Sequence, residues 1–330
     1  MAGIVAAVFA AAAACGSSPS SPSGNTTPTN PGAGFPAGPL ALTASPVAQS
    51  VINWITPLGN LNPPGHTVPT DHIYFYIADP NAGQSPITLR TAFFAPGNGT
   101  VTFIIGGAGQ ESKVIFRQTS TFSYYVDHVI LDTAMPLGTT VTAGQRIGVS
   151  GEAYAVDLGV INDSLTVPFL APSRYNSESL NADAPLKYFS EPLKSQLYAR
   201  VQRLGSQLDG LINYDVAGRL SGNWYSTTNS SLAFSFVYDT YDPSRVLISS
   251  TGAPVGVYEI AATDPLPRDV SVASGKVLYT LARTHGGPNP PHDSIAVFLL
   301  VQLTDDTHMR SEVFSARPSD FSSAARTWVR

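Results

Sequence analysis

Residues 141–151 read VTAGQRIGVSG, and this stretch decides how the chain folds. Three glycines, Gly144, Gly148 and Gly151, interrupt Val and Ile residues that alternate with other side chains. Glycine permits the tight reversals that short strands need, and alternating β-branched side chains fill one face of a strand. The stretch therefore predicts two short β-strands joined by a tight turn.

Strand-like segments continue on the N-terminal side of this stretch. β-branched and aromatic residues dominate them, and turn residues such as those at 95–99 separate them. The segments are 73–77, 101–105, 113–116 and 123–131. Short strands with regular turns are typical of a small barrel or sandwich, so we expect a mostly β domain at residues 46–167.

Composition excludes several classes of protein. The 330 residues include 18 basic and 23 acidic side chains, with a formal net charge of −5, and no basic stripe is present. A protein that neutralises phosphates needs clustered Lys and Arg, so we expect no nucleic-acid partner. A single cysteine also excludes a disulfide framework.

The N-terminal segment has the pattern of an export signal. Residues 4–14 form an apolar run that ends at Cys15, and the run is shorter than the roughly 20 residues that span a bilayer. Its last residues, AAACG, resemble the lipobox of bacterial lipoproteins. The resemblance implies a signal peptide at 1–14, lipidation of Cys15 and anchoring to a membrane of the bacterial cell envelope. The alternative is a plain signal peptide with an incidental cysteine.

Ser, Pro, Thr, Gly and Asn dominate the residues that follow Cys15. Such a composition does not bury a core. We therefore expect a disordered tether at 15–45.

Two segments carry a resemblance to a known family. Residues 91–101 (TAFFAPGNGTV) and 141–151 resemble the strand–turn–strand elements of lysostaphin-type zinc endopeptidases. Similar elements occur in biotinyl-lipoyl carriers and other barrel-sandwich hybrids, so they indicate the fold first. The resemblance implies a barrel-sandwich hybrid (duplicated hybrid motif) domain, a bound zinc ion and cleavage of peptidoglycan peptides. In that family one His–Asp motif and one His–x–His motif supply the zinc ligands.

The family's site residues have partial counterparts here. His66 and Asp71 lie where the His–Asp motif is expected, five residues apart instead of four. Ala155 and Asp157 stand where the two histidines of the His–x–His motif would be. The resemblance thus implies His66, Asp71 and Asp157 as zinc ligands and His128 as the group that assists the attacking water. Zinc favours nitrogen and sulfur over oxygen, so this site would be weaker than one with two histidines.

Each of these residues also has a purely structural interpretation. Asp71 can cap a turn while His72, a further possible ligand, packs beside Tyr74. His128 can be a half-exposed strand histidine, and Asp157 a surface or turn-stabilising carboxylate.

The rest of the chain predicts a connector and a second β domain. Leu and Val residues recur at helical spacing over 185–208, so we expect a linker and helix within 168–209. Strand patterns return over 210–330 and predict an antiparallel β domain with strands at 220–225, 232–238, 246–248, 256–260, 276–281, 295–303 and 309–314. Four aromatic residues there could stack on sugar rings or fill the core. They are Trp224, Tyr225, Tyr238 and Tyr241.

The favoured function is that of an exported, lipid-anchored envelope protein whose degenerate peptidase-like domain binds or scaffolds, with peptidoglycan or an envelope protein as partner. One alternative is an active zinc endopeptidase that cleaves peptidoglycan peptides. Another is an envelope carbohydrate-binding protein. The sequence leaves open whether the chain is an enzyme.

Overall fold

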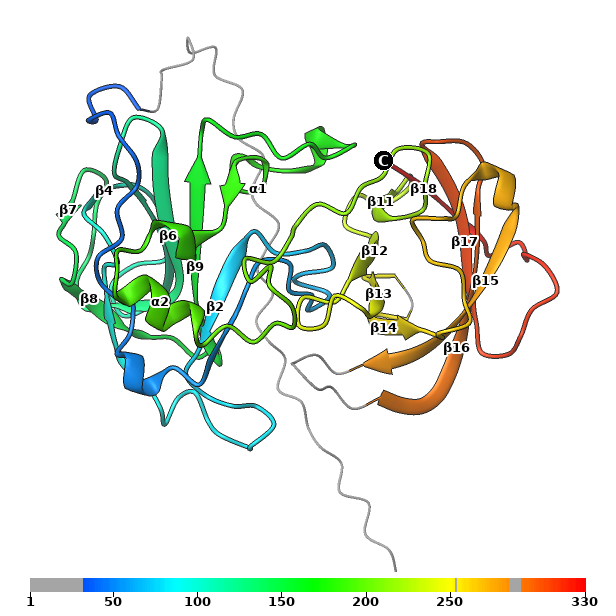
Figure 1. The fold of residues 1–330 in the computed structure, drawn as a ribbon, viewed down its shortest axis with the longest axis horizontal. Coiled ribbons are helices and arrows are strands. Elements are labelled where there is room, and N and C mark those ends of the chain that lie inside the picture. Colours follow the sequence, from blue (N-terminus) through cyan, green and yellow to red (C-terminus); the bar gives the residue numbers. More distant parts are fainter. Residues whose placement is uncertain (1–31, 253, 285–291) are drawn as a thin grey trace, which may run out of the picture.

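The computed structural model describes residues 32–252, 254–284 and 292–330 (Figure 1). Cys15, the expected signal peptide and the first half of the expected tether lie outside the described residues. The fold is mostly β, as predicted, and its strands form a sheet and a closed barrel that lie side by side. No helix in the described part is long and apolar enough to cross a membrane.

Ten strands of the described chain form the first sheet, which is antiparallel throughout. The path through it runs β1-β2-β9-β6-β5-β4-β7, with β10 paired to β9 and β8 paired to both β3 and β6. The strands are β1 (Trp54–Thr56), β2 (His72–Tyr76), β3 (Ala92–Phe94), β4 (Gly99–Ile105), β5 (Glu111–Arg117), β6 (Phe122–Leu131), β7 (Thr140–Val141), β8 (Arg146–Ser150), β9 (Ala155–Asn162) and β10 (Ala182–Asp183). The four predicted strand segments coincide with β2, β4, β5 and β6.

Residues 141–151 fold as their pattern predicts. They contain the end of β7, a turn and all of β8. The turn passes through Gly144, whose φ of 79° lies in the left-handed region that favours glycine. We call the ten-stranded sheet and the segments packed on it the first unit, and the barrel the second unit. Val141 and Ile147 are buried in the hydrophobic core of the first unit, so alternation along these short strands supplies part of that core.

The folded part begins before residue 46, which corrects the expected extent of the tether. Leu40 and Leu42 are buried in the core of the first unit. The backbone of Leu42 forms an isolated parallel bridge with Phe189. Burial of the two leucines and backbone pairing next to Phe189 therefore hold residues 40–42 against the rest of this unit.

The helix expected within 168–209 is present but covers only a small part of the periodic segment 185–208. The structure has a 3-10 turn at Pro185–Tyr188 and the short helix α2 at Leu193–Tyr198. Beyond α2 the chain turns back and pairs with β1, where Ile55 N–H donates to Arg200 O at 2.9 Å and Gln202 N–H donates to Ile55 O at 3.0 Å. Backbone pairing to an edge strand therefore replaces the last turns of the predicted helix.

The remaining helical segments of the described chain are short. The four-residue helix α1 spans Ser177–Leu180, and Asn176 caps it by accepting a hydrogen bond from Ser179 N. Three further 3-10 turns occur in the described chain, at Gln49–Val51, Pro172–Arg174 and Val272–Ser274.

Eight strands in the described part of the second unit form a closed antiparallel barrel. Each strand pairs with the next along the chain, and β11 closes on β18. The strands are β11 (Gly222–Ser226), β12 (Ala233–Tyr238), β13 (Val246–Ser250), β14 (Gly256–Ile260), β15 (Lys276–Thr284), β16 (His292–Leu303), β17 (His308–Phe314) and β18 (Arg326–Val329). The sequence predicted the first seven and missed β18.

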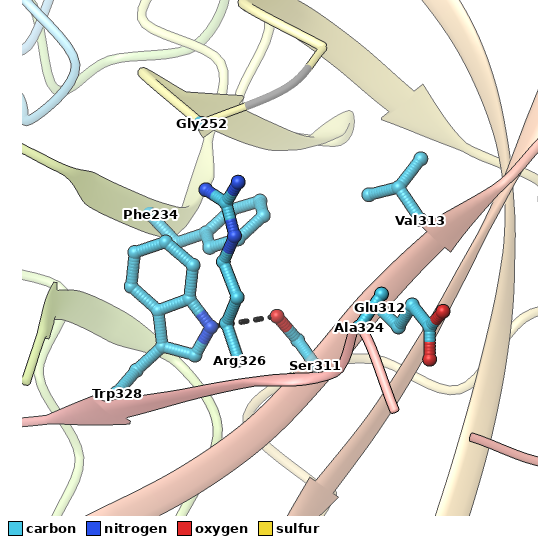
Figure 2. Close-up of a pocket in the computed structure, with 8 residues that line it drawn as sticks. All are labelled: Phe234, Gly252, Ser311, Glu312, Val313, Ala324, Arg326 and Trp328. Atoms are coloured by element: carbon cyan, nitrogen blue, oxygen red, sulfur yellow. Dashed lines mark hydrogen bonds between the residues drawn. The ribbon is translucent and has the colours of Figure 1, made fainter. Parts of the chain in front are cut away.

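The missed strand β18 carries Trp328, a central side chain of the barrel core. The Trp328 ring meets Phe234 edge to face at a centroid distance of 4.6 Å. Its indole Nε1 donates to Ser311 Oγ at 2.7 Å (Figure 2). Closure of the barrel thus depends on a short strand whose single buried aromatic gave too weak a pattern.

The four aromatic residues considered for sugar stacking do not form an exposed platform. Trp224 is fully buried in the barrel core, and Tyr225 and Tyr241 are less than a tenth exposed. Tyr238 is half-buried and packs against the same core. Core filling, the other interpretation, describes Trp224 and Tyr238, whereas Tyr225 packs against Tyr175 and Tyr241 contacts Thr56 of β1.

Buried hydrogen bonds join the sheet to the barrel. Thr56 Oγ1 on β1 lies 2.8 Å from the hydroxyl of Tyr241, and Thr240 Oγ1 donates to Leu58 O at 2.8 Å. The two units therefore share a polar junction.

Candidate functional site

Three neighbouring strands bring the predicted site residues together. Asp157 on β9 lies opposite Tyr74 of β2 on one side and Asp127 of β6 on the other. Side chains alternate between the faces of a strand, so these three residues share one face of the sheet. Val156 and Leu158, which point the other way, belong to the hydrophobic core. The site is thus the polar face of the strands whose apolar face forms the core.

Asp71, just before β2, is surrounded by donors. Its Oδ1 lies 2.9 Å from Nδ1 of His72 and accepts a hydrogen bond from the Tyr125 hydroxyl at 2.6 Å. Its Oδ2 accepts a hydrogen bond from Ser179 Oγ of α1 at 2.5 Å. Both carboxylate oxygens are therefore engaged within the protein.

A glycine allows Tyr125 to reach this carboxylate. Tyr125 on β6 lies opposite Gly159 on β9. A Cβ at Gly159 would stand only 2.0 Å from Cζ of the Tyr125 ring. The ring therefore passes directly over the glycine, and its hydroxyl arrives at Asp71.

His72 lies between two carboxylates. Its Nδ1 faces Asp71, and its Nε2 lies 3.3 Å from Oδ2 of Asp157 and 2.9 Å from the hydroxyl of Tyr74. The rings of His72 and Tyr74 pack with centroids 4.9 Å apart. This confirms the structural interpretation of His72 given above. The same residue also links the two acids.

His128 projects toward Asp157 because β6 is irregular there. The pairing of β6 with β5 shifts register between Ser112 and Val114, so Asp127 and His128 together face Lys113. His128 has a φ of 59°, the only left-handed value among the non-glycine residues that the structure describes. Such values are rare outside glycine and carry strain that the surroundings must offset. Here the backbone N–H of His128 donates to Asp127 Oδ1 at 2.8 Å.

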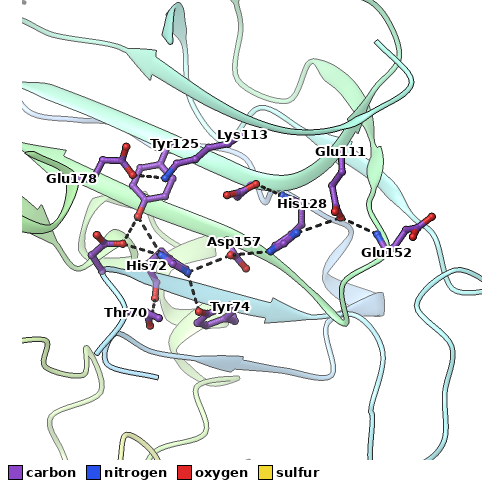
Figure 3. Close-up of polar contacts among 12 residues, drawn as sticks. Thr70, His72, Tyr74, Glu111, Lys113, Tyr125, His128, Glu152, Asp157 and Glu178 are labelled. Carbon is purple, nitrogen blue, oxygen red and sulfur yellow. Dashed lines mark hydrogen bonds and ion pairs between the residues drawn. The ribbon is translucent and has the colours of Figure 1, made fainter. Parts of the chain in front are cut away.

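The His128 ring continues the chain of contacts that begins at Asp71. Its Nε2 lies 3.6 Å from Asp157 Oδ2 and its Nδ1 lies 3.3 Å from Glu111 Oε1. Figure 3 shows the Asp157 carboxylate between the imidazoles of His72 and His128, which come from opposite sides. We call the series Asp71, His72, Asp157, His128 and Glu111 the acid–imidazole relay.

Electrostatics favour charged groups along the relay. Burial opposes charging of His128, but Asp157 and Glu111 outweigh it and raise the pKa of His128 to about 9. Burial also opposes charging of His72, whose pKa is nevertheless raised by Asp157 and Asp71. Burial alone would raise the pKa of Asp71, but hydrogen bonds from its neighbours hold that pKa well below its usual range. Burial raises the pKa of Asp157 itself, although His72 and His128 oppose that shift.

His66 lies beside the relay and is not paired with Asp71. Its ring meets His72 edge on, at a centroid distance of 5.3 Å. Burial and the neighbouring His72 lower the pKa of His66 to about 3, so it is neutral near pH 7.

Other contributors to the site were missed by sequence reasoning. Lys113 pairs with Glu178 of α1 and lies over the Tyr125 ring, 4.3 Å from its centroid. Glu111 reaches His128, and Ser179 reaches Asp71. No local pattern signals these residues, because β5 and α1 come to the site only through the folding of the sheet.

The residues present do not fit the zinc ion that the family resemblance implies. A protein zinc site needs at least three donors converging on one point at about 2.0–2.3 Å. Both oxygens of Asp71 are occupied, and the two imidazoles approach Asp157 from opposite sides. Asp157 Oδ1 is buried and has no hydrogen-bond partner among the described residues. Within residues 32–252, 254–284 and 292–330, no group of three or more His, Cys, Asp or Glu is arranged to hold a metal.

Comparisons with known proteins found structural likeness but no sequence match. No family model matches the chain, and no curated protein matches it. The solved structures that resemble it include lysostaphin, the antimicrobial peptidase from Staphylococcus simulans. That structure is 14% identical, with 77% of this chain and 100% of that one covered and a TM-score of 0.28.

Two further solved structures are similar to about half of the chain. The M23 metalloprotease pseudoalterin, from the deep sea, is 15% identical, with 45% of this chain and 87% of that one covered and a TM-score of 0.25. Csd3 of Helicobacter pylori is 16% identical over 46% of this chain, with a TM-score of 0.29. The match spans 33% of the Csd3 chain. The function of this chain therefore has to be argued from its own site.

Proposed function

We propose that this chain is a lipid-anchored protein of the bacterial cell envelope whose first β unit binds a partner and does not hydrolyse it. The observation that carries the proposal is the acid–imidazole relay. Both carboxylate oxygens of Asp71 are in contact with Tyr125, Ser179 or His72. The carboxyl group of Asp157 lies within 4 Å of two imidazoles. These contacts leave no oxygen of Asp71 free for a metal, whereas Asp157 Oδ1 and His128 Nδ1 are buried with no hydrogen-bond partner among the described residues.

The composition of the site supports the same proposal. Ala155 stands where the resemblance implies a catalytic histidine, and its side chain is buried. An alanine transfers no proton, so of the two positions to which the resemblance assigns an assisting histidine, only His128 keeps one. His128 holds its proton near pH 7 because its pKa is raised to about 9, which makes it a poor base at that pH.

The expected lipid anchor would keep the proposed binding unit at a membrane surface. Lipidation of Cys15 and the short tether after it would hold the sheet and barrel near a membrane surface. Peptidoglycan is then the favoured partner, and an envelope protein is the alternative.

The proposal is tested with the full chain carrying Cys15→Ser, so that it is soluble. We expect it to sediment with purified peptidoglycan, to release no soluble peptides from it and to contain no stoichiometric zinc. Peptide release together with one zinc per chain, both lost in Asp71→Asn, would establish the endopeptidase alternative instead. Failure to sediment would overturn peptidoglycan as the partner. Lipidation is tested separately by whether globomycin, which blocks lipoprotein signal cleavage, leaves a larger precursor of the natural chain.

A further inference from the structure

One end of the barrel carries a charged residue on its inner face. On β18, Arg326 and Trp328 lie two residues apart and so point to the same face. Trp328 belongs to the barrel core, so Arg326 also faces inward. The register confirms this, because Ser311 and Met309 of β17 lie opposite Arg326 and Trp328 respectively. Arg326 is exposed to solvent, whereas Trp328 two residues further on is almost fully buried.

This end of the barrel is hollow. A pocket of about 170 Å³ lies there, lined among others by Phe234, Gly252, Ser311, Val313, Arg326 and Trp328 (Figure 2). Phe234 and Trp328 are buried and form an aromatic wall. A cavity of about 150 Å³ is large enough to bind benzene. The pocket is therefore large enough for one ring or a short aliphatic chain.

The guanidinium of Arg326 is the free charge of the pocket. Among the described residues, the Arg326 side chain has no hydrogen-bond or ion-pair partner, and the residue is open to solvent. The Ser311 hydroxyl already accepts from the indole of Trp328. The pocket thus offers several unused N–H donors and one positive charge beside an aromatic wall.

The acid at the rim of the pocket does not neutralise this charge. The Glu312 carboxylate accepts hydrogen bonds from the backbone N–H of Ser322 at 2.7 Å and from its hydroxyl at 2.5 Å. Glu312 alternates with the inward-facing Ser311 along β17 and directs its carboxylate away from Arg326 (Figure 2). Glu312 thus has its own partners, and Arg326 is the positive charge that faces the pocket.

We propose that this pocket at the end of the barrel binds a small organic carboxylate. The carboxylate pairs with Arg326, whose planar fork of donors matches it in a bidentate arrangement. The apolar body of the ligand packs against Phe234 and Trp328. A free metabolite and the C-terminal residue of a peptide share this chemistry, and both have a terminal carboxylate next to an apolar group.

Isothermal titration of the soluble full chain (Cys15→Ser) with benzoate tests the proposal. Benzoate should bind one to one with a Kd on the order of 1 mM or tighter, as expected for a ligand of its size. Its neutral analogue benzamide should bind at least roughly tenfold more weakly, because the charge-assisted hydrogen bonds are lost. Equal binding of the two would overturn the role of the carboxylate, and no binding of either would overturn the site.

Variants assign the binding to this pocket. Arg326→Gln keeps a polar side chain of moderate length and should weaken benzoate binding by roughly tenfold or more. Gly252→Leu should abolish it, because a Cβ at Gly252 would stand 3.6 Å from Nη1 of Arg326 and its branches would extend into the pocket. Arg317→Gln is the matched control in the β17–β18 connection, and it should leave binding unchanged. Unaltered affinity in both Arg326→Gln and Gly252→Leu, with normal melting temperatures, would overturn the assignment.

A peptide that ends in phenylalanine distinguishes the two sources of carboxylate. Tighter binding of the free-acid peptide than of benzoate, with no binding of its C-terminal amide, would identify a peptide C-terminus as the ligand. Binding of benzoate without binding of the peptide would identify a free small carboxylate.

Discussion

Oδ2 of Asp157 lies 3.3 Å from Nε2 of His72, with both side chains almost entirely buried. The same oxygen lies 3.6 Å from Nε2 of His128. Asp157 is therefore the shared carboxyl partner of two imidazoles that come from different strands. Removing its charge would leave both rings facing a neutral group inside the protein.

Asp157→Asn should destabilise the chain by about 3 kcal/mol, because breaking a buried ion pair from one side leaves the partner charge uncompensated. Asparagine keeps the shape of the side chain, so the loss reports the charge. Urea unfolding followed by tryptophan fluorescence measures it.

Asp132→Asn is the matched control for this substitution. Asp132 also pairs with a cation, at 2.8 Å from Arg146 Nε, but both groups are exposed to solvent. Exposed pairs contribute little to stability. A loss at Asp157 no larger than that at Asp132 would contradict a stabilising role for the relay.

Stability should fall as the pH rises from about 6.5 toward 9. The ordinary pKa of histidine is about 6.5, and that of His128 is raised in the folded chain to about 9. A raised pKa means that the folded state holds the proton more tightly, so the stabilisation is complete below the unfolded pKa and is lost as pH rises through the folded one. The carboxylates that face the ring are Asp157, Glu111 and Asp127.

Melting temperatures measured across this pH range check the prediction. The decline should be smaller in His128→Gln, which has no proton to lose at this position. An equally steep decline in that variant would show that other groups cause it.

The sequence predicted the strands better than the site. Alternating β-branched and aromatic residues mark β2, β4, β5 and β6, because burial of one face imposes that pattern. The same reasoning failed for residues 185–208. In a continuous helix, Leu204 would lie on the same buried face as Leu197. Leu197 is fully buried, whereas Leu204 is 64% exposed. The spacing of apolar residues detected a local preference for helix. Backbone pairing of residues 200–202 with β1 outweighed that preference.

The convergence of Asp71, His128 and Asp157 on one face could be expected from the family resemblance, but their partners could not. Ser179 is 108 residues from Asp71 along the chain. His128 reaches Asp157 through a bulge and a left-handed backbone conformation, and neither has a signature in the sequence. Contacts set by tertiary packing lie outside what periodicity can predict.

Gly159→Ala should destabilise the site by about 1–3 kcal/mol, the usual cost of overpacking. The new methyl group would lie 2.0 Å from the Tyr125 ring, which must move and withdraw its hydroxyl from Asp71. Thermal unfolding measures the loss. Gly107→Ala is the matched control, because its Cβ would meet nothing nearer than Gln110 Oε1 at 3.9 Å. Equal effects of the two substitutions would contradict the close packing of Tyr125 on β9.

The junction between sheet and barrel should couple the stability of the two units. Tyr241→Phe removes the hydroxyl that lies 2.8 Å from Thr56 Oγ1 in a buried setting, and should cost about 1 kcal/mol. Thr56→Val removes the other partner and also the acceptor of Trp54 Nε1 at 3.2 Å, so it should cost somewhat more. Because both substitutions remove the same hydrogen bond, the double variant should lose less than the sum of the single losses. Strict additivity in urea unfolding would show that the two hydroxyls act independently, and two separate unfolding transitions in the natural chain would show that the junction does not couple the units.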